Sequence, residues 1–267
     1  MVDDIALYLR FAWQSIRSQM TYRVSFVALL FGNFAVTGAQ FLAIWLLFRR
    51  FHQVGGWNVN EVAVLYGVVD VAMGLPDLSN SGFEQCGTLV RRGDFDRILL
   101  RPRAAALQLM GREFALRRLG RVTQGAVVLV WGLAHVTTPL GWAAAGLLIA
   151  AICGGICVFL GLALLQATVS FWTLQGLELM SILNFGGAEA AEFPVHIYGR
   201  WLQRIFLTCV PLATVSYFPV LTVLHKPDPF GLPLAVHALA PLAGPSFLLV
   251  MIFFWRLAVR RYASTGS

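Results

Sequence analysis

Acidic and amide side chains inside apolar stretches are the first candidates for chemistry in this chain. Asp70 lies in one such stretch, and Gln175, Glu178 and Glu189 lie within residues 171–191. At 100° per residue, the last three fall within about 60° of one another on a helix and form one polar stripe. Ionisable groups at membrane depth are costly to bury and are therefore functional candidates. We expect Asp70 and the stripe to face either a transport pathway or a neighbouring helix.

The chain contains no motif for catalysis or metal binding. His-Glu-x-x-His and Gly-x-Ser-x-Gly are absent, and the five histidines and four cysteines match no metal-ligand spacing. The only lysine, Lys226, lies between His225 and Pro227, so the Gly-Lys-Ser/Thr of a phosphate-binding loop is also absent. We therefore expect no catalytic residue, no metal site and no cofactor in this chain.

The elements that must position these residues are long apolar helices. Hydrophobic residues make up 58% of the chain and charged residues 12%, against roughly 25% charged in an ordinary soluble domain. About 20 apolar residues suffice to cross a bilayer as a helix. We predict an all-α, polytopic membrane protein with one domain over 1–267 and six transmembrane helices: 24–48, 59–78, 122–137, 140–167, 171–191 and 232–255.

The basic residues predict the orientation of these helices. Fifteen of the twenty Lys and Arg residues lie in three places: before the first span, in the loop 79–121, and after the last span. The positive-inside rule then places both termini and this loop in the cytoplasm. It also explains the net charge of +7 without nucleic acid, so we expect membrane lipid but no nucleic acid as a partner. Residues 1–23 carry Arg10, Gln14 and Arg17 between apolar positions and predict an amphipathic interface helix.

The tract 193–231 allows two interpretations because prolines interrupt it, among them Pro194, Pro211, Pro219 and Pro227. In one, 205–224 crosses the membrane and 171–191 is a cytoplasmic amphipathic helix. In the other, which we favour, 171–191 is the fifth span and 193–231 is an external re-entrant hairpin that dips into the outer leaflet. Pro211 and Pro219 would weaken any straight helix, and Tyr217 would join an aromatic belt at the membrane surface.

Two stretches carry a resemblance to a known family. Gly93-Asp94-Phe95-Asp96-Arg97-Ile98-Leu99-Leu100-Arg101-Pro102 follows the second span, and Phe193-Pro194-Val195-His196-Ile197-Tyr198-Gly199-Arg200-Trp201-Leu202 precedes the Pro211 and Pro219 segments. In this order, the chain resembles the membrane subunit of ABC-2-type ATP-binding-cassette exporters over essentially its whole length.

The resemblance implies a half-transporter in the bacterial inner membrane. It would pair with a second permease, identical or a sister subunit, and dock on a separate ABC ATPase that binds ATP and Mg. The residues of the ATPase-coupling loop would be Arg91, Asp94, Phe95, Asp96, Ile98, Leu99, Leu100 and Pro102. Those of an external gate would be Tyr198, Trp201, Pro211, Tyr217 and Pro219.

The residues themselves also support the docking of 91–102, because its apolar side chains alternate with charged ones as in a helix that binds a groove. A solvated loop on anionic lipid is the alternative for this segment. The alternative for the whole chain is a secondary transporter that uses Asp70, Glu178 and Glu189 as a proton relay. Its expected signature, two similar halves, is not visible in the sequence.

Overall fold

The computed structural model describes residues 13–14, 16–19, 21, 23–101, 103–138, 140–173 and 182–262. Pro102, Gln175 and Glu178 lie outside the described residues, as does most of the predicted interface helix 1–23. The described part is helical, and its only extended pairing is an isolated bridge between Val54 and Trp57. The all-α prediction is therefore confirmed.

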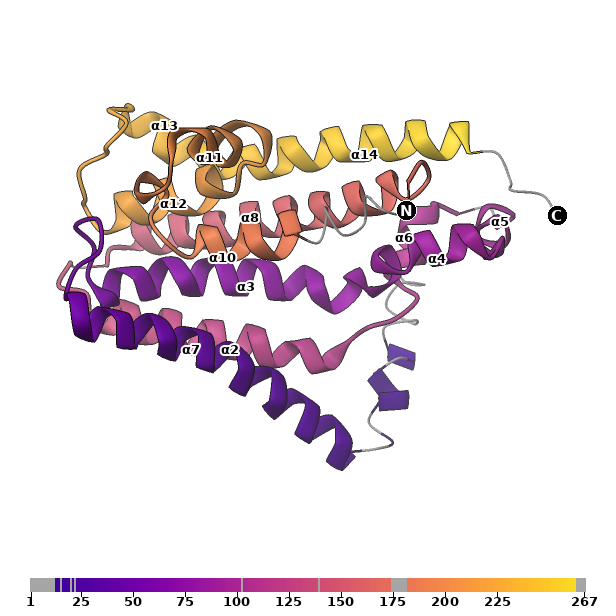
Figure 1. Ribbon diagram of the computed structural model, residues 1–267, viewed down its shortest axis with the longest axis horizontal. Helices are drawn as coiled ribbons and strands as arrows, with labels where there is room; N and C mark the ends of the chain where they lie inside the picture. Colours follow the sequence, from indigo (N-terminus) through magenta and orange to yellow (C-terminus); the bar gives the residue numbers. More distant parts are fainter. Residues whose placement is uncertain are drawn as a thin grey trace.

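The structure has five long helical segments, most of which run side by side along the long axis of the molecule, while the first of them runs obliquely to the others (Figure 1). They are α2 (Arg23–Phe51), α3 (Val59–Glu84), α7 (Leu119–His135), α8 (Trp142–Val169), and α14 (Ala243–Arg261), which follows α13 (Leu234–Leu239) and η6 (Ala240–Leu242). α3 is the central helix, since 89% of its most apolar window is buried, whereas α2 lies at the periphery with 11% buried.

Shorter elements gather at the two ends of this bundle (Figure 1). What we call the loop end carries α4 (Cys86–Arg91), α5 (Asp94–Leu99), α6 (Ala105–Met110) and η2 (Leu116–Arg118). The beginning of α2 and the end of α14 lie at the loop end too. What we call the hairpin end carries η4 (Val195–Ile197), α11 (Arg200–Arg204), η5 (Ile205–Cys209) and α12 (Leu212–Val223). The segments η3 (Ile182–Gly186) and α10 (Gly187–Ala191) precede them.

Among the described residues, four helices are long and apolar enough to cross a membrane, and a fifth candidate is a bent pair of helices. Six spans were predicted. The four are Arg23–Phe51, Val59–Arg91, Trp142–Val169 and Leu234–Arg261. α7, predicted as the third span, has 17 residues and is therefore about 26 Å long, slightly less than the hydrocarbon core of a bilayer. The middle of the predicted fifth span lies outside the described residues.

α3 extends beyond the predicted span 59–78 and includes Ser79, Asn80 and Ser81, which the sequence places in the loop 79–121. These polar residues are buried, and the helix continues to Glu84. Gly82 explains how α6 packs there: a β-carbon at this position would lie 1.8 Å from the carbonyl oxygen of Leu109. The loop therefore begins as a continuation of α3 that packs against α6.

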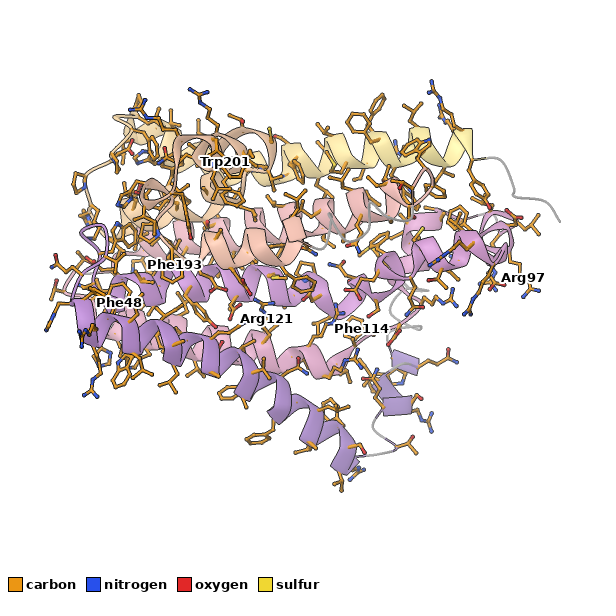
Figure 2. All side chains as sticks on the ribbon, in the orientation of Figure 1. Phe48, Arg97, Phe114, Arg121, Phe193 and Trp201 are labelled. Carbon is orange, nitrogen blue, oxygen red and sulfur yellow. The ribbon has the colours of Figure 1, made fainter. Side chains whose placement is uncertain are left out.

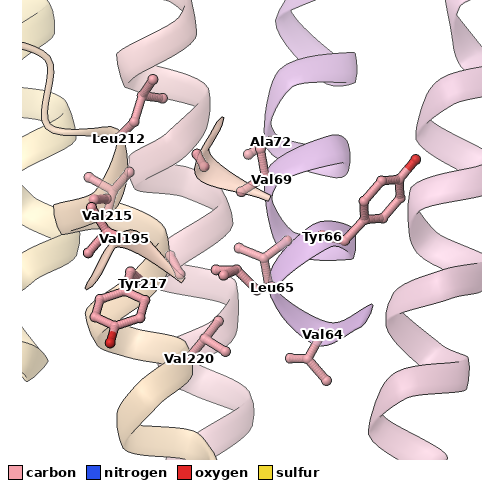
Figure 3. Close-up of a cluster of buried hydrophobic side chains, with 14 of the residues drawn as sticks. Val64, Leu65, Tyr66, Val69, Ala72, Val195, Leu212, Val215, Tyr217 and Val220 are labelled. Carbon is pink, nitrogen blue, oxygen red and sulfur yellow. The ribbon is translucent and has the colours of Figure 1, made fainter. Parts of the chain in front are cut away.

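The core lies between α3, α8 and α12. Figure 3 shows Leu65 and Val69 of α3 on the side that faces α12, with Tyr66 on the opposite side of the helix. Close approach of α8 and α14 depends on glycines, because a β-carbon on Gly244 would lie 2.1 Å from the carbonyl oxygen of Gly154. Small residues at such contacts are typical of helices packed in membranes.

The chain bends by 96° between Arg200–Cys209 and Leu212–Val223. Val210 and Pro211 form this break, at the proline where the sequence predicts one. Pro219, by contrast, lies within α12 and does not interrupt it, contrary to the prediction. A proline inside a helix costs about 3 kcal/mol. The near-complete burial of α12 against α3 and α8 offsets that loss.

Candidate functional site

A buried ion cluster lies in the middle of the helix bundle. It consists of Asp70 on α3, Arg121 on α7 and Glu192, the residue that follows α10. The Arg121 Nε donates to Asp70 Oδ1 at 2.7 Å, and Arg121 Nη2 lies 3.9 Å from Glu192 Oε1. The Asp70 and Glu192 side chains are 0% and 5% exposed. Figure 2 places Arg121 about midway along the bundle, far from both ends.

Polar neighbours extend the cluster toward α2. The Tyr66 hydroxyl donates to the carbonyl oxygen of Thr37 at 3.0 Å and lies 3.3 Å from Gln124 Oε1. Both Tyr66 and Gln124 are buried. One polar layer thus connects α2, α3, α7 and the end of α10.

Arg118 forms a second set of ion pairs, one turn closer to the loop end. Its Nη2 lies 2.9 Å from Glu84 Oε1, and its Nη1 lies 3.6 Å from Asp77 Oδ1 and donates to the Asp77 carbonyl at 3.0 Å. The sequence places both Arg118 and Arg121 in the loop 79–121. Arg118 does end η2 in that loop, whereas Arg121 lies in the first turn of α7, which begins at Leu119. α7 packs antiparallel to α3, and both guanidinium groups pair with acids of that helix.

A signal for this arrangement exists in the sequence. Asp70, Asp77 and Glu84 recur at intervals of seven residues and therefore lie on one face of α3. Two arginines near the start of the next long helix can pair with such a row. The recurrence would have identified Asp77, Glu84, Arg118 and Arg121 as members of the site.

The ion cluster has more acids than bases. Two carboxylates share the Arg121 guanidinium, and neither Asp70 Oδ2 nor Glu192 Oε1 has a hydrogen-bond partner within the described part of the chain. A buried charge without full compensation costs several kcal/mol. The cluster can therefore take up a proton or a cationic group, and it also ties three segments together.

Of the predicted polar stripe, only Glu189 can be placed. It is exposed on α10, whereas Glu192, three residues on, points into the cluster. The structure therefore brings the predicted candidate Asp70 together with Glu192, through Arg121, and leaves Glu189 of the stripe exposed.

The predicted coupling loop folds so that one side is buried and the other is exposed. Phe95 is 0% exposed and packs its ring against Phe171, Trp255 and Tyr262, at centroid distances of 5.1, 6.3 and 5.3 Å. Ile98 is half-buried against the same cluster, whereas Leu100 is 84% exposed. Phe95 thus anchors α5 to the bundle. The exposed side of this segment, with Leu99 and Leu100, is its outer face.

Charged residues surround this outer face. Arg91, Arg97 and Arg101 are exposed, and Arg97 lies 3.6 Å from Asp94 on the same helix. Figure 2 shows Arg97 at the extreme of the loop end. Gly93, with φ of +70°, allows the turn that separates α4 from α5. The result is a short amphipathic helix that presents leucine and arginine side chains outward.

The predicted gate residues are split between core and surface. Tyr217 is 1% exposed, stacks on Trp57 at 5.7 Å and lies 2.9 Å from His196 Nδ1 through its hydroxyl. It therefore does not join a surface aromatic belt, as the sequence predicted, because α12 packs with this face inward. Trp201 is 68% exposed, while Pro211 and Pro219 are buried. Burial and the charge of Glu192 raise the pKa of Tyr198 to about 12, so its phenol stays neutral.

The hairpin end is fastened to the turn between α2 and α3. Lys226 Nζ lies 2.9 Å from Glu61 Oε2, donates to the Gly56 carbonyl at 2.7 Å and lies 5.2 Å from the centre of the Trp57 ring. His196 Nε2 lies 2.9 Å from the carbonyl oxygen of Gly55. These contacts connect residues more than 130 positions apart in the chain, so they hold the bent segment in place.

No three His, Cys, Asp or Glu side chains of the described residues are placed to hold a metal ion.

In the comparison with protein families, the model described as "ABC-2 family transporter protein" matches residues 34–266. No curated protein and no solved structure matches the chain significantly.

Proposed function

This chain belongs to the ABC-2 family of transporter proteins, and we propose that it is the permease subunit of an ATP-driven exporter. It would form half of the translocation pathway and dock on a separate ATPase that binds ATP and Mg. The family match begins at residue 34, within α2, and covers the other four long helices and most of both end regions.

The docking proposal rests on the exposure of apolar side chains on the outer face of α5. Leu99, the last residue of α5, and Leu100, its C-cap, are 39% and 84% exposed, whereas Phe95 on the other side of the same helix is fully buried. An apolar patch bordered by arginines suits an amphipathic helix that inserts into a groove of another protein. The anchoring of Phe95 would transmit movement of the docked ATPase to α8 and α14.

The exposed helix α2 supports pairing with a second permease. Its apolar window is 11% buried, and large side chains such as Phe31, Val36 and Leu46 are exposed. In a half-transporter, such a helix would line the interface with the second subunit or the pathway between them. The Asp70–Arg121–Glu192 cluster would then lie behind α2 and stabilise the helices that move.

The bent segment 200–223 is proposed to enter the outer leaflet and return to the same side. A 96° bend fits either a broken span or a re-entrant loop. The contacts of the flanking residues His196 and Lys226 with the α2–α3 turn and Glu61 support the re-entrant form, because they hold both ends of the segment at the hairpin end. With the positive-inside rule, the loop end is cytoplasmic and the hairpin end external. Two such hairpins would close the external end of the pathway.

Purification of the full chain from its native membrane, in mild detergent, tests this function. We expect an ATP-binding subunit to co-purify and its ATP hydrolysis to depend on the presence of the chain. Absence of any ATP-binding subunit, combined with transport that collapses when the proton gradient is dissipated, would contradict the proposal and support the secondary transporter instead.

A further inference from the structure

A groove of about 580 Å³ lies on the side of the molecule where α6, α8 and α14 meet. Its walls are apolar and include Phe83, Leu164, Leu248 and Ile252. It belongs neither to the ion cluster nor to the outer face of α5. We expect another molecule to cover these apolar walls. The difference in charge between the two ends of the groove indicates what kind of molecule it is.

The groove runs along α14 from Leu248 to Arg260. These residues are twelve positions apart, which corresponds to about 18 Å along a helix. Half of the hydrocarbon core of a bilayer is about 15 Å thick. The groove therefore extends from near the middle of the membrane to one surface, the depth of a single leaflet.

The two ends of the groove differ in charge. Its inner end is lined by Leu160 and Leu248, whereas Arg256 and Arg260 lie at the loop end. Both arginines are exposed, and neither forms an ion pair with any residue that the structure describes. An apolar channel with two unpaired guanidinium groups at the membrane surface complements an acyl chain joined to an anionic headgroup.

We propose that this groove binds one anionic phospholipid from the leaflet at the loop end. An acyl chain lies between α6, α8 and α14, and the phosphate is held by Arg256 and Arg260. Basic pockets between membrane helices bind anionic headgroups in this way. The groove adjoins Phe83 and Trp255, whose rings pack together at 6.2 Å, and Trp255 also contacts Phe95 of α5. The lipid would therefore stabilise the anchor of that helix.

Native mass spectrometry of the full chain in detergent tests the proposal, with phosphatidylglycerol and phosphatidylcholine as the probes. The wild-type chain should bind phosphatidylglycerol more tightly than phosphatidylcholine. Removal of both charges in R256Q/R260Q should weaken phosphatidylglycerol binding about thirtyfold, from roughly 1 kcal/mol per basic residue near an anionic surface. The matched control R200Q/R204Q, which removes two exposed arginines at the other end, should leave binding unchanged.

A second variant tests the acyl-chain site independently of charge. Ala106 lines the groove and is only partly buried, so A106F should fill it and weaken binding of both lipids. A134F, at an exposed position of α7, is the control. Unchanged phosphatidylglycerol binding in either R256Q/R260Q or A106F would overturn the proposal. Loss of a dimer in A106F without loss of lipid would show that a second copy of the chain occupies the groove.

Discussion

Arg121 is the residue on which three segments of the bundle converge. Its guanidinium contacts Asp70 on α3 and approaches Glu192 after α10. All three side chains are at most 14% exposed, so little solvent is present to replace a lost partner. A buried ion pair such as Arg121 with Asp70 adds little net stability, because both charges lose their hydration on folding. Removal of one partner is nevertheless costly, because it leaves an uncompensated buried charge.

The first prediction at the residue scale concerns this arginine. R121Q should destabilise the chain by about 3–5 kcal/mol, because Asp70 and Glu192 lose their counter-charge. R117Q, at an exposed arginine four positions earlier, should change stability by at most about 0.5 kcal/mol. Denaturant unfolding in detergent measures both. The double variant D70N/R121Q should be less destabilised than the sum of its single variants. Additive effects would show that the two side chains do not interact.

Lys226 permits a second prediction at this scale. K226M removes the ion pair with Glu61 and the hydrogen bond to Gly56, contacts of a charged group worth about 1–3 kcal/mol. Amide hydrogen exchange at residues 225–233 should become faster because this loop loses its attachment to the α2–α3 turn. R204M removes an exposed arginine of the same end and serves as control. Equal exchange in both variants would contradict the fastening role.

At the scale of elements, the exposure of each α5 side chain decides which substitutions affect docking without affecting packing. The sequence indicates an apolar stripe, but only the structure shows that Phe95 and Ile98 belong to the core and Leu99 and Leu100 to the surface. Substitution of Ile98 by a charged residue would perturb packing as well as docking. The sharper variant changes only the two exposed leucines.

L99D/L100D should release a docked ATPase while the chain remains folded and inserted. Two carboxylates would replace the apolar patch that the docked ATPase would cover, and burial of each charge at that interface is costly. L99M/L100M keeps the patch apolar and should retain the ATPase. Co-purification of the ATPase with each variant is the measurement. Full retention in L99D/L100D would remove this face of α5 from the interface.

The bent segment carries a prediction about topology. In a cysteine-free background, single cysteines at Gly199 and Pro227 should both react with an impermeant external reagent, because the segment between them returns to its starting side. Both positions are exposed. A cysteine at Arg92, in the loop end, should react only after the membrane is opened. If Pro227 also requires an opened membrane, the segment crosses the bilayer and the gate is lost with it.

At the scale of the whole molecule, the sequence predicts the all-α class and places most of the long helices within a few residues of their observed bounds. Long apolar runs determine these helices almost without regard to context. Context decides the rest. The sequence predicts a loop at Ser79–Ser81 because their burial against α6 is not visible in it. It predicts Tyr217 at the surface because the rotation of α12 about its axis depends on packing. Arg121 looked like a loop arginine for the same reason.

In the proposed assembly, the chain docks a separate ATPase through its loop end. A photo-reactive amino acid in place of Leu100, which is 84% exposed, tests this in intact membranes. The same probe in place of Trp201, which is exposed at the hairpin end, is the control. We predict a covalent adduct between the Leu100 position and an ATP-binding subunit, and none from the Trp201 position. An adduct only with lipid at Leu100, or an ATPase adduct at Trp201, would contradict docking through the loop end.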